Sequence, residues 1–357
     1  MKVLFIAPVS CIHVARWANS VVDKVDELHI LTMHNEAHRF SEQIYIHKLK
    51  FKAPLGYILN KFDVQTCVSK IKPDIIHVHQ ISGHGTLMAL INIKGYLISI
   101  YGADVYSFPN KSLFHKMLIK YNLKRAGYLA STSNAMARET KKYTNKKIFV
   151  TPFGVDIDRF RNSRSPDLES DQIHVGIVKS LREKYGLKYL IKAIPILENR
   201  LKDAGNKKEI KVSIYGKGYL RDDLINLASK LNLKNIEFPG FVSNEKVSEI
   251  LNSFDLVCIP SIEDSESFGV SAVEAMACER PLVVSDVDGL SEVVTQNETG
   301  LIVKRKDSEA IAEGLYDLIN NPPKALNFGL NGRNRVKELY DWRKNVQEML
   351  AIYDSIK

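Results

Sequence analysis

The chain has 357 residues, 45% hydrophobic and 25% charged, which suits a globular protein with two ordinary cores; no apolar run reaches the roughly 18 residues that a membrane-spanning helix needs. The net charge of +9 is uneven, because residues 1–164 hold 24 Lys and Arg against 11 Asp and Glu, whereas the remainder is slightly acidic. A basic half attracts anionic partners, such as phosphorylated substrates, anionic membrane surfaces or nucleic acid.

The first apolar run, residues 3–12, is interrupted by Pro8 and has no small-residue cleavage site, so we interpret it as a buried strand and not as a signal peptide. The four cysteines, Cys11, Cys67, Cys258 and Cys278, lie far apart without a CxxC pair. This spacing fits neither a disulfide framework nor a zinc site, and we expect a cytosolic protein.

Short apolar, β-branched runs alternate with helical patterns along the whole chain, which is typical of buried parallel strands joined by helices. In the first half we predict strands at Val3–Ala7, Glu27–Leu31, Asp74–Val78, Tyr96–Ile100, Tyr128–Ser131 and Ile148–Thr151. In the second half we predict strands at Ile173–Val178, Lys211–Tyr215, Asn235–Phe238, Leu256–Pro260, Pro281–Ser285 and Gly300–Val303. Between them, residues 158–171 are polar, contain Pro166 and are interpreted as a linker. The pattern predicts two doubly wound α/β domains that face each other across a ligand-binding cleft.

His13 and Arg16 follow the first predicted strand, at the start of a helix whose apolar face includes Val14, Ala18 and Val21. Because ligands bind at the carboxyl ends of parallel strands, we expect both polar side chains at the cleft end of the first domain.

Residues 111–125 carry five cations and no acid, with Phe114, Met117, Leu118 and Tyr121 at helical spacing. One interpretation is a basic amphipathic helix on an anionic membrane surface, where a lipid-linked acceptor would be found. The other is an ordinary domain helix with a solvated basic face. Nucleic acid is not indicated, because the sequence has no zinc finger, helix-turn-helix signal or aromatic RNP stretch.

Three cations, Lys179, Arg182 and Lys184, follow the predicted strand at 173–178. Cations at a strand end would stabilise the charge that develops on a diphosphate leaving group, although solvated surface cations remain the alternative. Gly216 and Gly218 form a turn after the next strand, which would allow a phosphate or base to approach the backbone closely. The third glycine of a dinucleotide fingerprint is missing, so no nicotinamide cofactor is expected.

The segment from residue 259 to 278 runs from a strand through a loop into a helix that begins near Gly269. The backbone there, from Ser267, Phe268 and Gly269 to Val270, would offer unpaired amides and the positive end of a helix dipole to a diphosphate. Glu266 lies in the loop and Glu274 lies more than a turn into the helix. These carboxylates could bind two polyhydroxyl groups, or could be solvated helix carboxylates.

Two DxD strings, at residues 156–158 and 286–288, are interpreted as turn residues. We expect no metal requirement, because the cations and the helix dipole already serve the phosphates.

The stretch around the two glutamates resembles the retaining glycosyltransferases of family four, which have the GT-B fold. Matching positions are Ser261, Glu266, Phe268, Gly269, Glu274, Ala275, Met276, Ala277, Cys278 and Pro281. Residues 288–294 are similar to the motif GGxPEVV of the family, and residues 298–303 to its GxTGLLV. Glu279 and Ser291 depart from a glycine and a proline of these motifs. The resemblance covers almost the whole chain.

The resemblance implies that Glu266 contacts the donor sugar near the reacting centre and that Glu274 binds the ribose. It gives Lys184 the place of a lysine that binds phosphate, and Lys179, approximately, that of an arginine. Arg182 and Gly216 are expected to belong to the same donor site.

In the first half, residues 10–17 resemble the S-x-H-x-x-R-W motif of a branch that acts on cell-surface polysaccharides, which implies acceptor contacts for His13 and Arg16. Tyr101 stands where the family usually has a histidine, and Asp104 of the following G-x-D is expected to orient a substrate hydroxyl.

The resemblance implies a GT-B protein with an acceptor-side domain at 1–164, a nucleotide-sugar domain at 165–340, and a terminal helix at 341–357 that packs on the first domain. We expect a retaining, metal-independent transfer of a hexosyl or N-acetylhexosaminyl group from a nucleoside-diphosphate sugar, with UDP as the expected nucleotide, to a glycan or lipid-linked acceptor. No other cofactor is required. The expected location is cytoplasmic or peripheral on the inner face of the membrane. The alternatives are a nucleotide-sugar epimerase and a non-catalytic partner subunit of the same architecture.

Overall fold

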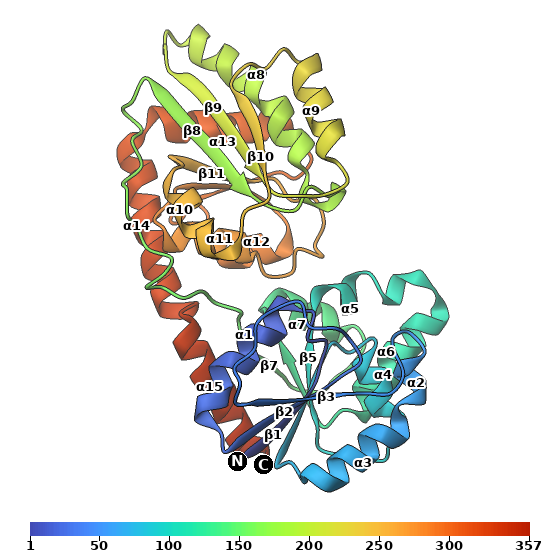
Figure 1. Ribbon diagram of the computed structural model, residues 1–357. Coiled ribbons are helices and arrows are strands. Elements are labelled where there is room, and N and C mark those ends of the chain that lie inside the picture. The colour runs from blue at the N-terminus through green and yellow to red at the C-terminus, as the bar shows by residue number, and fades with distance from the viewer. The chain divides into compact units, whose positions relative to one another are not determined.

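A computed structural model describes residues 1–357 as two compact units. The first unit contains Met1–Phe153 and Arg343–Lys357, and the second contains Gly154–Trp342. Each unit is a parallel sheet with helices on its faces (Figure 1). No helix in the protein combines the length and the apolar character needed to cross a membrane.

The sheet of the first unit has seven strands in the order β3-β2-β1-β4-β5-β6-β7, and all its neighbours pair in parallel. The strands are β1 (Lys2–Ile6), β2 (Glu27–Thr32), β3 (Ile44–Lys48), β4 (Ile75–His79), β5 (Leu97–Ile100), β6 (Tyr128–Ser131) and β7 (Ile148–Val150). The helices are α1 (Ile12–Val21), α2 (Gly56–Leu59), α3 (Lys61–Ile71), α4 (His84–Ala89), α5 (Gly102–Tyr106), α6 (Leu113–Arg125) and α7 (Asn134–Lys141), followed at the end of the chain by α15 (Trp342–Ile356). On α15, Tyr353 is buried and its hydroxyl lies 2.7 Å from Nδ1 of His77 on β4. The C-terminal segment thus completes the core of the first unit.

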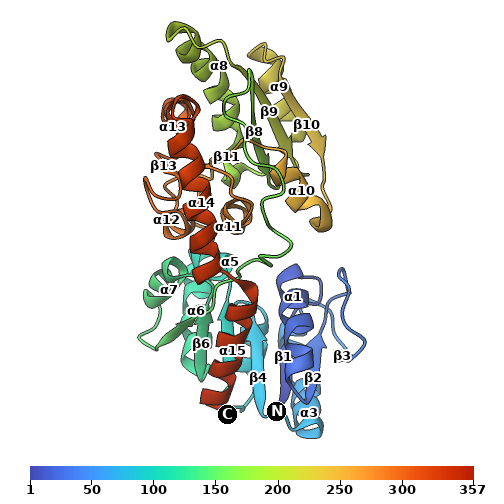
Figure 2. The same cartoon turned by 90° about the vertical axis from the view of Figure 1, so that its left-hand side faces the viewer.

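The sheet of the second unit has six parallel strands in the order β10-β9-β8-β11-β12-β13. They are β8 (Gln172–Val178), β9 (Glu209–Tyr215), β10 (Ile236–Gly240), β11 (Leu256–Ile259), β12 (Leu282–Ser285) and β13 (Leu301–Val303). The helices are α8 (Leu187–Asp203), α9 (Arg221–Lys230), α10 (Val247–Asn252), α11 (Val270–Ala277), α12 (Asp288–Val293), α13 (Ser308–Asn320) and α14 (Pro322–Leu339), seen from a second side in Figure 2.

The strand order reverses at β8, whose neighbours are β9 on one side and β11 on the other. At such a switch point the loops after the two central strands diverge and leave room for a ligand. Here those loops begin at Lys179 and Pro260, so the fold itself brings the predicted cation loop and the predicted glutamate loop to one edge.

All the predicted strands are present, with ends that differ by one or two residues, and the two doubly wound sheets are confirmed. Strand β3 was not predicted. It pairs only with β2, and of its residues only Ile44 is buried. An edge strand with one covered side lacks the continuous apolar run by which the other strands were found.

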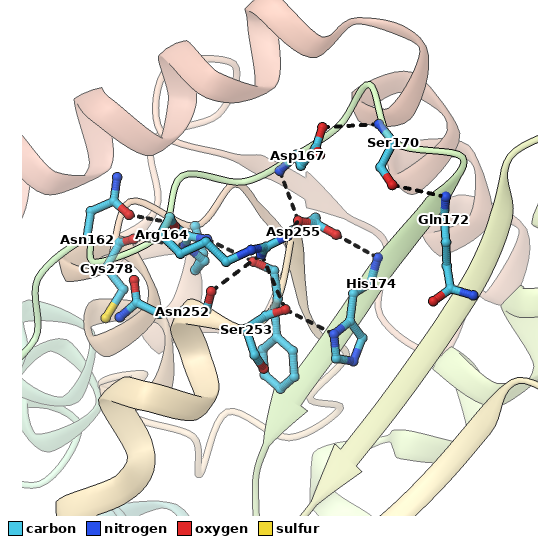
Figure 3. A network of polar contacts seen from close by, with 12 residues as sticks. Asn162, Arg164, Asp167, Ser170, Gln172, His174, Asn252, Ser253, Asp255 and Cys278 are labelled. Atoms are coloured by element: carbon cyan, nitrogen blue, oxygen red, sulfur yellow. Dashed lines mark hydrogen bonds and ion pairs between the residues drawn. The ribbon is translucent and has the colours of Figure 1, made fainter.

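Residues 158–171, predicted to be a linker, are clamped onto the second unit (Figure 3). The buried carboxylate of Asp255 accepts hydrogen bonds from the amides of Asp167 and His174, each at 2.9 Å, and from Nη2 of Arg164 at 3.0 Å. The Asn252 side chain accepts from the amide of Ser163 at 2.9 Å. The predicted domain boundary was residue 164, whereas the units divide after Phe153 because these bonds hold the segment to the second sheet.

We expect Asp255→Ala to lower the free energy of unfolding by about 2 kcal/mol, because two partly buried backbone amides lose their acceptor. The ion pair with Arg164 adds little, since that side chain is 47% exposed. Urea denaturation followed by circular dichroism measures the change, with Asp203→Ala on the exposed end of α8 as the control. An Asp255→Ala midpoint equal to that of the control would contradict the assigned role of the clamp.

Candidate active site

Lys179 is the first residue after β8, and its side chain joins the two loops of the switch point. Its Nζ donates to Oε1 of Glu266 at 2.8 Å and to Oγ of Ser271 at 2.9 Å. The side chains of Lys179 and Glu266 are only 9% and 8% exposed. A buried lysine and a buried glutamate therefore form the centre of the site.

The protonation of Lys179 follows from its neighbours. Burial acts to lower the pKa of its ammonium, but the charge of Glu266, the nearby Tyr185 and the hydrogen bond to Glu266 outweigh it, and the pKa is raised. Glu274 raises it further. Lys179 is therefore a permanent cation at neutral pH.

Helix α11 begins at this cluster with a glycine. Gly269 has φ of +81°, in the left-handed region that a side chain would strain, and its carbonyl accepts from the amides of Ala272 and Val273. The first amides of a helix have no carbonyl of the preceding turn to bind. At α11 these belong to Val270 and Ser271, beside the ammonium of Lys179. The arrangement favours an anion.

Glu274 lies three residues after Ser271, on the same face of α11. It is half-buried, and its charge acts on Lys179. The structure thus brings together Glu266, Lys179, Ser271 and Glu274.

Lys184 joins the cluster through an aromatic ring. The Nζ atoms of Lys179 and Lys184 lie 4.7 Å and 4.9 Å from the centroid of the Tyr185 ring, within the range of cation–π attraction. The turn that carries Lys184 and Tyr185 packs closely against the end of β11, because a Cβ on Gly186 would lie 2.0 Å from the carbonyl oxygen of Pro260. Arg182 is exposed, and no ion pair or hydrogen bond ties its guanidinium to the cluster.

Gly216 packs against the backbone that carries Lys179. Its amide donates to the carbonyl of Gly240 at 2.7 Å, and a Cβ on it would lie 1.8 Å from the carbonyl oxygen of Lys179. The carbonyl of Lys179 therefore fills the side of Gly216 on which a side chain would lie. The glycine is required because the backbone that carries Lys179 passes directly over it.

Ser267 and Phe268 lead into α11. Ser267 is half-buried, whereas the Phe268 ring is buried and meets the ring of Tyr340 edge-on at 5.6 Å. Phe268 thus anchors the loop with its side chain.

The second DxD string belongs to a salt-bridge network. Arg305 donates from Nε to Asp286 at 2.8 Å and from Nη1 to Asp264 at 2.9 Å. No group of three or more His, Cys, Asp or Glu side chains in the protein is arranged to hold a metal ion.

His13 lies at the start of α1 in the first unit, where its ring stacks on Phe153 at 4.0 Å between centroids. Burial, then the charges of Arg16 and His38, lower its pKa to about 4. At neutral pH His13 is an uncharged imidazole. Arg16 lies on the next turn of the same helix and is half-buried.

Asp104 was expected to orient a substrate hydroxyl, but its carboxylate is occupied within the fold. It accepts from the amides of Ile81, Ser82 and Tyr101, at 3.0–3.2 Å, and from the Ser82 hydroxyl at 2.6 Å. Burial raises its pKa against the effect of these bonds, and only 3% of the residue is exposed. Asp104 therefore fixes the loop after β4 and caps α5.

The sequence reasoning missed Ser271 and Tyr185. Ser271 is the second residue of α11, so its position after Gly269 could have shown that it faces the strand ends. No signal in the sequence shows that the Tyr185 ring lies between two lysines, because that contact depends on how the turn folds back.

Two family models match the chain. The model described as Glycosyl transferases group 1 matches residues 158–335, and the one described as Glycosyl transferase 4-like matches residues 2–133. An uncharacterized glycosyltransferase of Methanocaldococcus jannaschii is 25% identical over 338 residues, 92% of this chain and 90% of the relative. Phosphatidyl-myo-inositol mannosyltransferase of Mycobacterium leprae is 25% identical over 288 residues, 79% of this chain and 74% of the relative.

Solved structures share the fold. Sucrose-phosphate synthase of Thermosynechococcus elongatus superposes with a TM-score of 0.81 at 18% identity, over 99% of this chain and 98% of the other. HepE of Anabaena, in complex with UDP and glucose, superposes with a TM-score of 0.77 at 16% identity, over 99% of this chain and 100% of the other. These similarities establish the GT-B fold.

We expect Tyr185→Leu to weaken the binding of UDP about tenfold, because the two lysines lose the ring that holds them together. Tyr185→Phe keeps the ring face and is expected to bind as the wild type does. Isothermal titration calorimetry with UDP measures both. Equal affinities for the leucine and phenylalanine variants would exclude a positioning role for the ring.

Proposed function

The chain belongs to the glycosyl transferases of group 1, and from that premise we propose that it transfers a sugar from a nucleoside-diphosphate sugar to an acceptor hydroxyl with retention of configuration. The observation that carries the proposal is the buried contact of Lys179 with Glu266 and Ser271 at the start of α11. Neither an epimerase nor a non-catalytic subunit is favoured by any feature of this cluster.

The diphosphate is proposed to lie against the first amides of α11, with Lys179 and Lys184 as its cations. Breaking the bond between sugar and phosphate leaves negative charge on the phosphate oxygens, and fixed cations and amides stabilise that charge. Both groups are held in place before the donor arrives, Lys179 by Glu266 and Ser271, and Lys184 by the Tyr185 ring. No metal is part of the proposal.

Glu266 is proposed to accept hydrogen bonds from the donor sugar. Its Oε1 is bound by Lys179, which leaves Oε2 for a sugar hydroxyl. A carboxylate tied to a lysine is a poor nucleophile, so we propose that the acceptor attacks on the face from which the phosphate leaves. The enzyme then contributes position and electrostatics without forming a covalent intermediate.

Glu274 is proposed to bind the ribose, one turn of α11 beyond the phosphate site. The proposed nucleotide is UDP, which HepE holds in its structure. On the acceptor side we propose His13 and Arg16. The neutral imidazole of His13 can donate and accept a hydrogen bond with acceptor hydroxyls.

The proposed acceptor is a glycan or a lipid-linked sugar, and the proposed location is cytoplasmic and peripheral on the inner face of the membrane. The name of the M. leprae relative, a phosphatidyl-myo-inositol mannosyltransferase, supports a lipid acceptor. Helix α6 supports the membrane contact, because Leu113, Phe114 and Met117 are 73%, 68% and 62% exposed beside its lysines. An ordinary domain helix would bury such side chains.

We expect Glu266→Gln and Lys184→Ala each to lower kcat by about 10²–10³, because each removes a charge that acts in the transition state. Release of UDP from a panel of UDP-, GDP- and ADP-sugars with glycan and lipid acceptors measures the rate, in buffer with EDTA. Lys230→Ala, on the exposed end of α9, is the control. Full activity in both site variants would reject the assignment.

The triple variant Lys116→Gln, Lys120→Gln and Lys124→Gln removes three positive charges from α6. We expect its affinity for anionic liposomes at low salt, measured by co-sedimentation, to be about a hundredfold lower than that of the wild type. Each lysine near an anionic surface contributes about 1 kcal/mol, and salt screens it. Unchanged co-sedimentation of the triple variant would reject the membrane contact of α6.

A further inference from the structure

Residues 51–62 of the first unit, the 51–62 segment, include α2 and the start of α3 and expose apolar side chains. Leu55, Ile58 and Phe62 are 67%, 56% and 66% exposed. Phe51 and Leu59 are exposed as well. A cluster of large apolar side chains in water is unusual on a monomeric protein and marks a surface that another phase or partner covers.

Hydrogen bonds within the segment hold its backbone in one conformation. The buried side chain of Asn60 accepts from the amide of Phe51 at 2.9 Å and donates to its carbonyl at 2.7 Å. The amide of Gly56 donates to the carbonyl of Lys52 at 2.8 Å, and a Cβ on Gly56 would lie 2.3 Å from the carbonyl oxygen of Phe51. The turn is closed by its own polar groups, and its apolar side chains are held outward.

The segment and α6 pack against the same helix, α4 (Figure 1). From the segment, the ring of Tyr57 meets the ring of His84 on α4 edge-on, with 5.3 Å between the centroids. From α6, the hydroxyl of Tyr121 donates to the carbonyl of Ala89 at 3.2 Å. Through α4, the two exposed apolar elements belong to one rigid part of the first unit.

The same part of the chain carries most of the net positive charge of residues 1–164. Residues 43–138 contain 13 Lys and Arg against 3 Asp and Glu, and one of those acids is the buried Asp104. Lys50, Lys52 and Lys61 flank the apolar side chains of the segment. A second copy of this surface would be repelled by it, whereas an anionic bilayer offers both apolar depth and the opposite charge.

We propose that the 51–62 segment is a second membrane-binding element, whose apolar side chains enter the headgroup region of an anionic bilayer while α6 supplies cations. The inference rests on the membrane contact proposed above for α6 and adds a second group of exposed apolar side chains to Leu113, Phe114 and Met117 of that helix. The segment acts by burial of Leu55, Ile58 and Phe62, so its contribution persists at high salt.

The test compares binding of the full-length protein to vesicles of phosphatidylcholine with one-third phosphatidylglycerol, at low and high salt. Leu55→Ser, Ile58→Ser and Phe62→Ser together are expected to weaken binding at least about tenfold at both salt concentrations. The control removes two exposed apolar residues from α14 of the second unit, Leu326→Ser and Leu330→Ser, and is expected to bind as the wild type does.

A tryptophan placed in the segment reports membrane insertion directly, without removing an apolar side chain. Phe62→Trp is expected to shift its fluorescence to the blue, and to be quenched by brominated lipid, when vesicles are added. The two native tryptophans, Trp17 and Trp342, are buried and give little background change.

Binding of the triple serine variant equal to the wild type, together with an unshifted Phe62→Trp spectrum, overturns the inference. If the lysine variants of α6 then still lose binding, the contact of α6 stands and only the 51–62 segment is excluded. If the wild-type protein does not bind the vesicles, the membrane contacts of α6 and of the 51–62 segment are both rejected. Sedimentation equilibrium showing a dimer that the serine variant dissociates would assign the face to a second copy and also overturn the inference. Sugar transfer to a soluble acceptor is measured without vesicles, so its outcome is independent.

Discussion

The contact of Lys179 with Glu266 and Ser271 is the constraint on which the rest of the second unit's site depends. It links the carboxyl end of β8 to the start of α11, and both charged side chains lie out of water. Burying two charges costs more than a surface pair, and breaking the pair would leave one of them uncompensated. The backbone under Lys179 is correspondingly fixed, since only a glycine fits at residue 216. A buried ion pair contributes little to the stability of a fold. The position of the Lys179–Glu266 pair at the switch point, where ligands bind, therefore favours a role in binding or catalysis.

The units differ in how their charge is used. In the first unit most of the cations are exposed and they outnumber the acids, which creates a field that reaches beyond the protein. In the second unit the buried cation of the cluster, Lys179, lies beside the carboxylates of Glu266 and Glu274, and its field is local. Under the proposed function this division is sensible, because the membrane is large and anionic, whereas the donor has to be held at one place and in one orientation.

The alternation of apolar runs predicted almost every strand, because buried parallel strands are apolar on both faces. The glutamates and the lysines after β8 were found for a related reason, since the edge where strands end is set by topology. What the sequence could not predict depends on side-chain packing. Asp104 looks like a ligand contact in the sequence, yet its carboxylate is buried and accepts four hydrogen bonds. The sequence also does not show that the carbonyl of Lys179 packs against Gly216. A motif gives the residue type at a position and does not give the competing partners that the fold brings to it.

The order of charges around α11 gives the proposed function its physical logic. From the loop into the second turn of the helix, an acid is followed by a cation and then by a second acid. These are Glu266, then Lys179 beside Ser271, and then Glu274. A nucleoside-diphosphate sugar has the complementary order, with hydroxyls on the sugar, phosphates in the middle and hydroxyls on the ribose. The cluster of Lys179, Lys184, Glu266 and Glu274 has no net charge, so it does not attract anions at a distance. It favours a ligand whose phosphates meet the cations and helix amides while its hydroxyls meet the carboxylates, and it opposes one that places a phosphate beside Glu266 or Glu274. Selectivity for a sugar nucleotide over a simple polyphosphate then follows from the arrangement of charges and not from their sum.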